Sequence, residues 1–300
     1  MKEIFEVFFK SIKLYFGSFP SFLKYMSFPV FGQLLGLFWI LGITYLYINY
    51  LPLLMKHSIF TNYAIIFFTL ILITLPGLFV MLKAFWDYIV AYGAINSMID
   101  GLIKSGYVYD FPAHNEVVIR KTPKFISIWL IISFIGTICM FPLLLIVGAI
   151  LFVYFILVFQ VFVFEPDENA FNCFKRSFQI IKGKFGKTFI LMLLIGGFTM
   201  FLLPGLANYS LEYAKLTKYL AIPFDNLTNL LPVEEINKIL PYRVNSLMLA
   251  QMFVQSVINF IIIGFTLPIR TICWGLWYKQ NAKAKAKIDK RILKRAEGKE

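Results

Sequence analysis

The chain has 300 residues, of which 59% are hydrophobic and only 15% are charged, and its formal net charge is +13. A soluble domain carries charge on about a quarter of its residues and needs a polar exterior, so this composition excludes a soluble globular protein. The charges also fall in short blocks with long uncharged stretches between them, which is typical of a chain that crosses a membrane several times.

Six stretches are predicted to cross the bilayer as helices, because each offers the roughly 20 apolar residues that one crossing needs. Residues 125 to 164 carry no charge at all and would make about 60 Å of helix, so they hold two crossings with a turn at Pro142. The predicted spans cover residues 28–50, 61–82, 125–141, 143–164, 188–207 and 246–268. The sequence thus predicts an all-α polytopic protein, with residues 1–278 as a single six-helix transmembrane domain and residues 279–300 as a basic tail.

Two amphipathic elbow helices are predicted at the membrane surface, over residues 2–19 and 168–186, ahead of the first and fifth spans. In each, large apolar residues recur at steps of three and four and so share one helical face. The two faces consist of Phe5, Phe8, Ile12, Tyr15 and Phe19, and of Phe171, Phe174, Phe178, Ile181 and Phe185. Both segments also read S-x-x-(I/L)-x-x-G-x-F, from Ser11 and from Ser177. An internal duplication and the convergence of two elbow helices on one pattern both explain this match.

The segments between the spans differ in character. Residues 83–104 are predicted to be helical, either as a cytoplasmic extension of span two or as a segment that re-enters the membrane, with Lys83 and Asp87 as an i,i+4 pair. Residues 105–123 are predicted to form a polar loop. An outer loop over residues 208–245 is divided by prolines into short pieces with room for one or two small helices.

The exit from span six combines a cation, aromatic residues and lysines. Arg270 is predicted to snorkel to the interface, with an ion pair to Asp87 or Glu165 as the alternative. An aromatic belt at the membrane surface is predicted from Trp274, Trp277 and Tyr278.

The distribution of Lys and Arg predicts the orientation, because these residues accumulate on the cytoplasmic side of bacterial-type membrane proteins. With the N-terminus inside, 24 of the 29 basic residues lie in cytoplasmic segments. We therefore expect a multi-pass protein of a bacterial inner membrane with both ends in the cytoplasm. The basic tail is expected to attract anionic lipid headgroups, at about 1 kcal/mol per cation. Topology explains the net charge, so no nucleic-acid partner is expected.

The stretch Cys173-Phe-Lys-Arg176-Ser177-Phe178-Gln-Ile180-Ile-Lys-Gly183-Lys-Phe185 follows Glu165, which ends the fourth predicted span. This pattern resembles a loop in a group of bacterial six-helix membrane proteins. The group includes the membrane domain that accompanies some glycerophosphoryl diester phosphodiesterases, and uncharacterised relatives. Cys173 stands where that group usually has Ala, and Phe178 where it usually has Trp. The resemblance implies the six-helix layout and no catalytic residue.

The sequence does not predict an enzyme. A phosphodiesterase of that kind needs clustered His, Glu and Asp in a soluble barrel, whereas His57 and His114 fall on opposite sides of the predicted membrane. No phosphate-binding loop, dinucleotide fingerprint or nucleophile elbow occurs, so no cofactor is expected. The three cysteines lie far apart in the sequence, which makes neither a metal site nor a disulfide framework.

A polar ridge in span six is the best functional hint. Gln251, Gln255 and Asn259 recur at steps of four inside an apolar helix, and such residues face other helices or water because lipid cannot satisfy their hydrogen bonds. They are predicted either to bridge helices or to line a solute path to which Gln33 and Gln160 contribute. We therefore expect a non-enzymatic membrane scaffold or a component that interacts with lipids and partner proteins. The alternative is a transporter or channel for a small solute.

Overall fold

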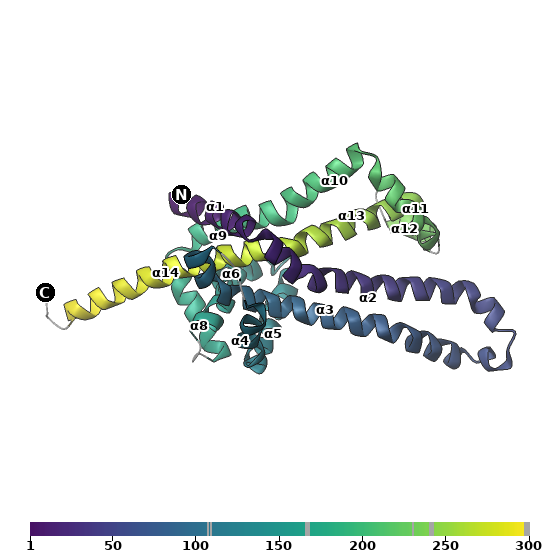
Figure 1. Ribbon diagram of the computed structural model, residues 1–300, viewed down its shortest axis with the longest axis horizontal. Helices are drawn as coiled ribbons and strands as arrows, with labels where there is room; N and C mark the ends of the chain where they lie inside the picture. Colours follow the sequence, from purple (N-terminus) through teal and green to yellow (C-terminus); the bar gives the residue numbers. More distant parts are fainter. Residues whose placement is uncertain (107, 109, 166–168, 230, 240–242, 297–300) are drawn as a thin grey trace. The chain divides into compact units, whose positions relative to one another are not determined.

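The computed structural model describes the backbone of residues 1–296, apart from residues 107, 109, 166–168, 230 and 240–242. It describes side chains as far as residue 282, except those of residues 58 and 61. Every regular element in this described part is a helix, so the predicted all-α fold is confirmed (Figure 1). The elements are α1 (Lys2–Gly17), α2 (Phe19–Leu54), η1 (Ser58–Thr61), α3 (Tyr63–Ser105), α4 (Phe111–Ile119), α5 (Thr122–Cys139), α6 (Leu145–Phe155), α7 (Val158–Phe164), α8 (Ala170–Ile181), α9 (Phe185–Gly196), the π-helix η2 (Gly197–Leu202), α10 (Leu203–Tyr213), α11 (Leu216–Thr228), α12 (Val233–Ile239), α13 (Ser246–Phe265) and α14 (Leu267–Ala296).

Within the described residues, six helical stretches are long and apolar enough to cross a membrane, so the chain is a multi-pass membrane protein. They cover Phe19–Leu54, Tyr63–Ser105, Thr122–Cys139, Leu145–Phe164, Phe185–Tyr213 and Ser246–Ala282. The first, second, fifth and sixth extend well beyond the predicted spans. The reason is that a helix need not end where its apolar stretch ends: the 43 residues of α3 make about 65 Å of helix, twice the thickness of the hydrocarbon core.

The chain divides into two compact units, each assembled from segments far apart in the sequence. Unit 1 comprises Met1–Tyr25, Ile89–Thr199 and Thr266–Glu300, and unit 2 comprises Met26–Tyr88 and Met200–Phe265. The boundaries at residues 25 and 88 fall inside α2 and α3, without a linker or a change of composition. For that reason the sequence alone presents residues 1–278 as one domain.

Unit 2 contains the paired parts of α2 and α3, which run side by side in Figure 1. Glycines allow this close approach: a Cβ on Gly77 would lie 2.6 Å from the Trp39 ring and 2.9 Å from the carbonyl oxygen of Gly36. Small residues at a helix contact bring the backbones together in this way. In the same unit α13 packs against α10 and α11, with Ala221 and Val254 in the buried core.

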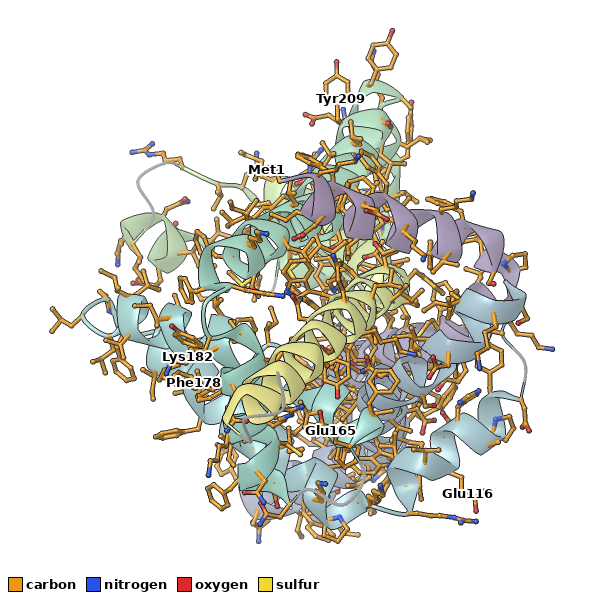
Figure 2. The ribbon with its side chains drawn as sticks, turned by 90° about the vertical axis from the view of Figure 1, so that its left-hand side faces the viewer. Met1, Glu116, Glu165, Phe178, Lys182 and Tyr209 are labelled. Carbon is orange, nitrogen blue, oxygen red and sulfur yellow. The ribbon has the colours of Figure 1, made fainter. Side chains whose placement is uncertain are left out.

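In unit 1 the first elbow helix, α1, packs against α14; Figure 2 shows α1 in purple and α14 in yellow. Its buried residues are Ile4, Val7, Ser11 and Tyr15. The predicted apolar face lies about one residue away from this buried face, since Phe5 and Phe19 are exposed. Burial raises the pKa of Tyr15 to about 12.

The second elbow helix, α8, buries the positions that match those of α1. Its buried residues are Cys173, Phe174, Ser177, Ile180 and Ile181. The pairs Val7 and Cys173, Ser11 and Ser177, and Tyr15 and Ile181 occupy equivalent positions of the sequence repeat and are all buried. Phe171, predicted to lie on the anchoring face, is 77% exposed. The chain leaves α8 through Gly183, whose φ of +85° is one that other residues rarely adopt.

Residues 83–104 belong to a single unbroken helix, so α3 continues past the apolar span and does not turn back. Its last turns bury Ala91, Ile95, Ile99 and others within unit 1. The predicted ion pair is confirmed, with Lys83 Nζ 2.5 Å from Asp87 Oδ1.

The predicted polar loop after α3 contains the short helix α4. Asp110 caps this helix by accepting a hydrogen bond from the backbone N–H of Ala113. Ser97 Oγ lies 2.6 Å from His114 Nδ1 and so joins α3 to α4 within unit 1. Burial holds the pKa of His114 below its ordinary value.

Candidate functional site: a polar cluster around α14

The first half of α14 lies inside unit 1. Every residue from Thr266 to Tyr278 is buried, and α14 contacts α1, α7, α8 and α9. The prediction of an aromatic belt at the membrane surface is therefore wrong: Trp274, Trp277 and Tyr278 are 5%, 1% and 6% exposed. Trp and Tyr prefer an interface because one end of the ring needs a polar partner, and a buried polar partner meets the same need.

Tyr278 finds its partner in Glu165, at the end of α7. The Tyr278 hydroxyl donates to Glu165 Oε1 over 2.5 Å, and Arg176 Nε of α8 lies 3.1 Å from Oε2 and 3.2 Å from Oε1. About a quarter of each side chain of the ion pair is exposed. Next to it, Ser177 Oγ donates to the carbonyl oxygen of Tyr154 over 2.8 Å. Glu165, Arg176 and Ser177 are the residues of the loop pattern, and here they join α6, α7, α8 and α14.

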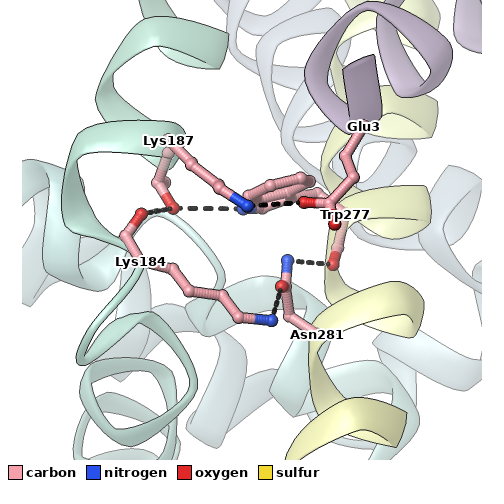
Figure 3. Close-up of polar contacts among 6 residues, drawn as sticks. Glu3, Lys184, Lys187, Trp277 and Asn281 are labelled. Atoms are coloured by element: carbon pink, nitrogen blue, oxygen red, sulfur yellow. Dashed lines mark hydrogen bonds and ion pairs between the residues drawn. The ribbon is translucent and has the colours of Figure 1, made fainter. Parts of the chain in front are cut away.

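Trp277 and Asn281 hold the start of α9 against α14, as Figure 3 shows. Trp277 Nε1 donates to Thr188 Oγ1 over 3.1 Å. Lys184 Nζ donates to Asn281 Oδ1 over 2.5 Å, and Asn281 Nδ2 donates to the carbonyl oxygen of Trp277 over 2.7 Å. Burial lowers the pKa of Lys184 from its ordinary value. A lysine that is partly removed from water is thus held by an amide oxygen.

The N-terminus of α1 is tied to α9 by an exposed ion pair, also drawn in Figure 3. Lys187 Nζ lies 2.8 Å from Glu3 Oε2, and this hydrogen bond lowers the pKa of Glu3. Exposed ion pairs contribute little to stability, so this pair helps to orient α1 and adds little to the free energy of its packing. The buried face of α1 on α14 holds it.

Lys279 completes the set. It forms an ion pair with Asp100 of α3, and its ammonium group lies 4.8 Å from the centre of the Phe164 ring. Phe164 in turn stacks on Tyr278. The α14 polar cluster is the set Asp100, Glu165, Arg176, Lys184, Thr188, Trp277, Tyr278, Lys279 and Asn281. Its groups satisfy one another across helices, which suits it to hold helices in register.

The predicted polar ridge lies on α13 in unit 2. Gln251, Gln255 and Asn259 are all half-buried. Asn208 Nδ2 of α10 donates to Asn259 Oδ1 over 2.7 Å, which is an interhelical hydrogen bond. Gln251 and Gln255 make no side-chain hydrogen bond to another residue of the described chain. The structure thus places Asn259 in a hydrogen bond between two helices, whereas Gln251 and Gln255 are half-buried without such a bond within the described residues.

The other predicted polar residues lie apart from the ridge. Gln160 belongs to unit 1, where its amide lies in hydrogen-bond contact with the buried amide of Asn96, 3.1 Å away. Gln33 donates to the carbonyl oxygen of Pro29 in its own helix over 2.6 Å. Arg270 is only 8% exposed and donates to Thr266 Oγ1 over 3.2 Å, so the prediction of a snorkelling side chain is wrong. Arg270 thus finds a polar partner inside unit 1 and not at the membrane surface.

Four residues that make these contacts were not predicted from the sequence: Asn96, Thr188, Asn208 and Asn281. For Asn96 and Asn281 a signal existed, because each is a polar residue on a helix that continues an apolar stretch. Thr188 and Asn208 lie at the two ends of a predicted span, where polar residues are expected and so attract no notice.

Comparisons of the chain with protein-family models, curated proteins and solved structures find no match. The resemblance to the six-helix group therefore stays a prediction.

Proposed function

We propose that the chain is a non-enzymatic protein of a bacterial inner membrane, with both ends in the cytoplasm, that acts through contacts with lipids and partner proteins. In this proposal α8, α4 and the two termini lie on the cytoplasmic side. The basic tail carries nine Lys and Arg between residues 279 and 299, and the eight that follow Lys279 rest against anionic lipid. We also propose membership of the six-helix group that the loop pattern resembles.

The observation that carries the proposal is the use of polar side chains between helices. Asn259 pairs with Asn208, Gln160 contacts Asn96, and the α14 polar cluster connects helices of unit 1. A solute path needs polar groups turned toward water, whereas these are turned toward one another. This use supports a scaffold.

The arrangement of residues on helix α1 supports the proposal that the chain contacts lipid. One side packs on α14, a second side exposes Phe5, Phe9 and Phe16, and a third carries charged residues such as Lys2 and Lys13. A helix with one apolar and one basic exposed side suits the boundary between acyl chains and headgroups.

A transporter or channel for a small solute is the second candidate. The half-buried Gln251 and Gln255 favour it, because neither makes a side-chain hydrogen bond to another described residue. Two such amides one turn apart on α13 could instead meet water in a cavity.

Replacing Gln251, Gln255 and Asn259 together with Leu separates the two candidates. The scaffold predicts a lower unfolding temperature in detergent, because Asn208 loses its partner and an interhelical hydrogen bond in a membrane protein is worth about 0.6 kcal/mol, with a maximum near 2. It also predicts that a Gln255→Cys variant reacts slowly with a water-soluble thiol reagent. The control is Ser256→Leu on the same helix, where the Ser256 side chain is exposed and bonds only its own helix.

A triple variant as stable as the control, together with rapid labelling at position 255, would contradict the scaffold. That result would place the transporter first.

A further inference from the structure

A pocket of about 390 Å³ opens in unit 1 between α1, the end of α3 and α14. Its polar walls come from all three helices, namely Glu6, Lys10, Asp100, Lys104, Lys279 and Gln280. Its remaining walls are apolar and include Val7 and Leu276. The pocket is distinct from the contacts that hold Trp277 and Tyr278, and it shares only the Asp100–Lys279 pair with the α14 polar cluster.

The charges of this pocket do not balance. It has three lysines and two carboxylates, and the Asp100–Lys279 ion pair accounts for one of each. Within the described chain, no carboxylate oxygen lies within ion-pair distance of Lys10 or Lys104. Two lysines from different helices therefore line one concavity, and Glu6 is the only other carboxylate among its described lining residues. An entering anion would relieve their repulsion and gain from both.

The pocket opens on the charged side of α1. Glu6 and Lys10 lie one helical turn apart, on a different side from the exposed phenylalanines Phe5, Phe9 and Phe16. A ligand therefore reaches the pocket from the polar side of α1.

We propose that this pocket binds the phosphate group of a small phosphorylated ligand. The Lys10 and Lys104 ammonium groups would hold its oxygens as point charges, and the Gln280 amide would donate a further hydrogen bond. The apolar walls would contact the carbon part of the ligand. A soluble phosphate ester and the headgroup of a phospholipid share this chemistry. The proposal does not rest on the scaffold function, because Lys10 and Lys104 belong neither to the polar ridge nor to the α14 polar cluster.

The test uses the full chain in dodecyl maltoside without phosphate, and three probes: inorganic phosphate, O-phosphoethanolamine and short-chain phosphatidylglycerol. A ligand that binds only the folded chain raises its unfolding temperature. We expect at least one probe to do so. The Lys10→Gln/Lys104→Gln variant should bind that probe about tenfold more weakly or worse, because both charge-assisted contacts are lost.

Two variants keep the test specific. Lys10→Arg/Lys104→Arg retains both charges and should retain binding. Lys175→Gln/Lys182→Gln removes the same number of charges from exposed positions of unit 1 outside the pocket and should bind as the parent does. A response to the soluble probes assigns a soluble ester, and a response to phosphatidylglycerol alone assigns a lipid headgroup. The proposal is overturned if no probe stabilises the parent, if the pocket variant responds like the parent, or if the Lys175/Lys182 variant loses the response equally.

Discussion

Replacing Trp277 with Ala is expected to cost about 3–5 kcal/mol of stability, the largest effect of any single change considered for this chain. The Trp277 side chain is 1% exposed, and it lies on α14, which packs against both elbow helices, α1 and α8. Deleting it leaves a large cavity and also leaves the Thr188 hydroxyl without its donor. The measurement is unfolding of the purified protein in detergent, monitored by the far-ultraviolet circular dichroism of its helices, a signal that does not depend on tryptophan fluorescence.

Two further variants divide this effect into packing and hydrogen bonding. Trp277→Phe keeps most of the ring and removes the N–H, so it should cost only about 1–3 kcal/mol. Phe201→Ala deletes an aromatic ring that is 75% exposed and should cost little. A cost for Trp277→Ala no greater than that for Phe201→Ala would show that the Trp277 side chain is not packed inside unit 1.

Replacing Arg176 with Ala is expected to cost about 1–3 kcal/mol. It removes two charge-assisted contacts from Glu165 and leaves a carboxylate, three-quarters shielded from water, with Tyr278 as its remaining partner in the ion-pair group. The figure lies below that for a fully buried pair because about a quarter of each side chain reaches solvent. The neighbouring Lys175→Ala variant removes an exposed charge and should leave stability nearly unchanged.

A double-mutant cycle identifies the pair itself. Glu165→Gln combined with Arg176→Gln should cost less than the sum of the two single changes, because the single changes each leave one charge uncompensated. Additive costs would mean that Glu165 and Arg176 do not interact in the folded protein.

The fold class could be predicted from the sequence because the uncharged stretches match the thickness of a bilayer. The ends of the helices could not. The sequence left open whether the segment after Lys83 extends span two into the cytoplasm or re-enters the membrane, whereas in the structure Ile95 and Ile99 bury it in unit 1 as part of the same helix. Long-range packing decides where such a helix ends, and packing has no local signature.

The faces of the elbow helices show why periodicity is less informative here than in soluble proteins. In a membrane protein both lipid and the protein core are apolar, so a row of large apolar residues identifies neither. In α1 the phenylalanines Phe5 and Phe9 are exposed, while Ser11 is fully buried against the unit 1 core. Small residues such as Ser11 and Cys173 were the better guide to the packed face.

The sequence could predict that some polar side chains form contacts between helices, and it could not predict which residues are their partners. Gln160 and Asn259 stand out because they interrupt apolar helices, but their partners Asn96 and Asn208 come from distant segments. Likewise Glu165 and Arg176 occur in one loop pattern, and only the fold shows that Tyr278 joins them.

Labelling of single cysteines tests the proposed topology most directly, namely six spans with both ends on the cytoplasmic side. The background has Cys139, Cys173 and Cys273 replaced with Ala, and the exposed positions Lys2, Lys182 and Lys218 are changed to Cys one at a time. In sealed spheroplasts a membrane-impermeant maleimide should label position 218 alone, and after disruption of the membrane it should label all three. Labelling at position 2 or 182 in sealed spheroplasts, or protection of position 218 until disruption, would contradict this topology.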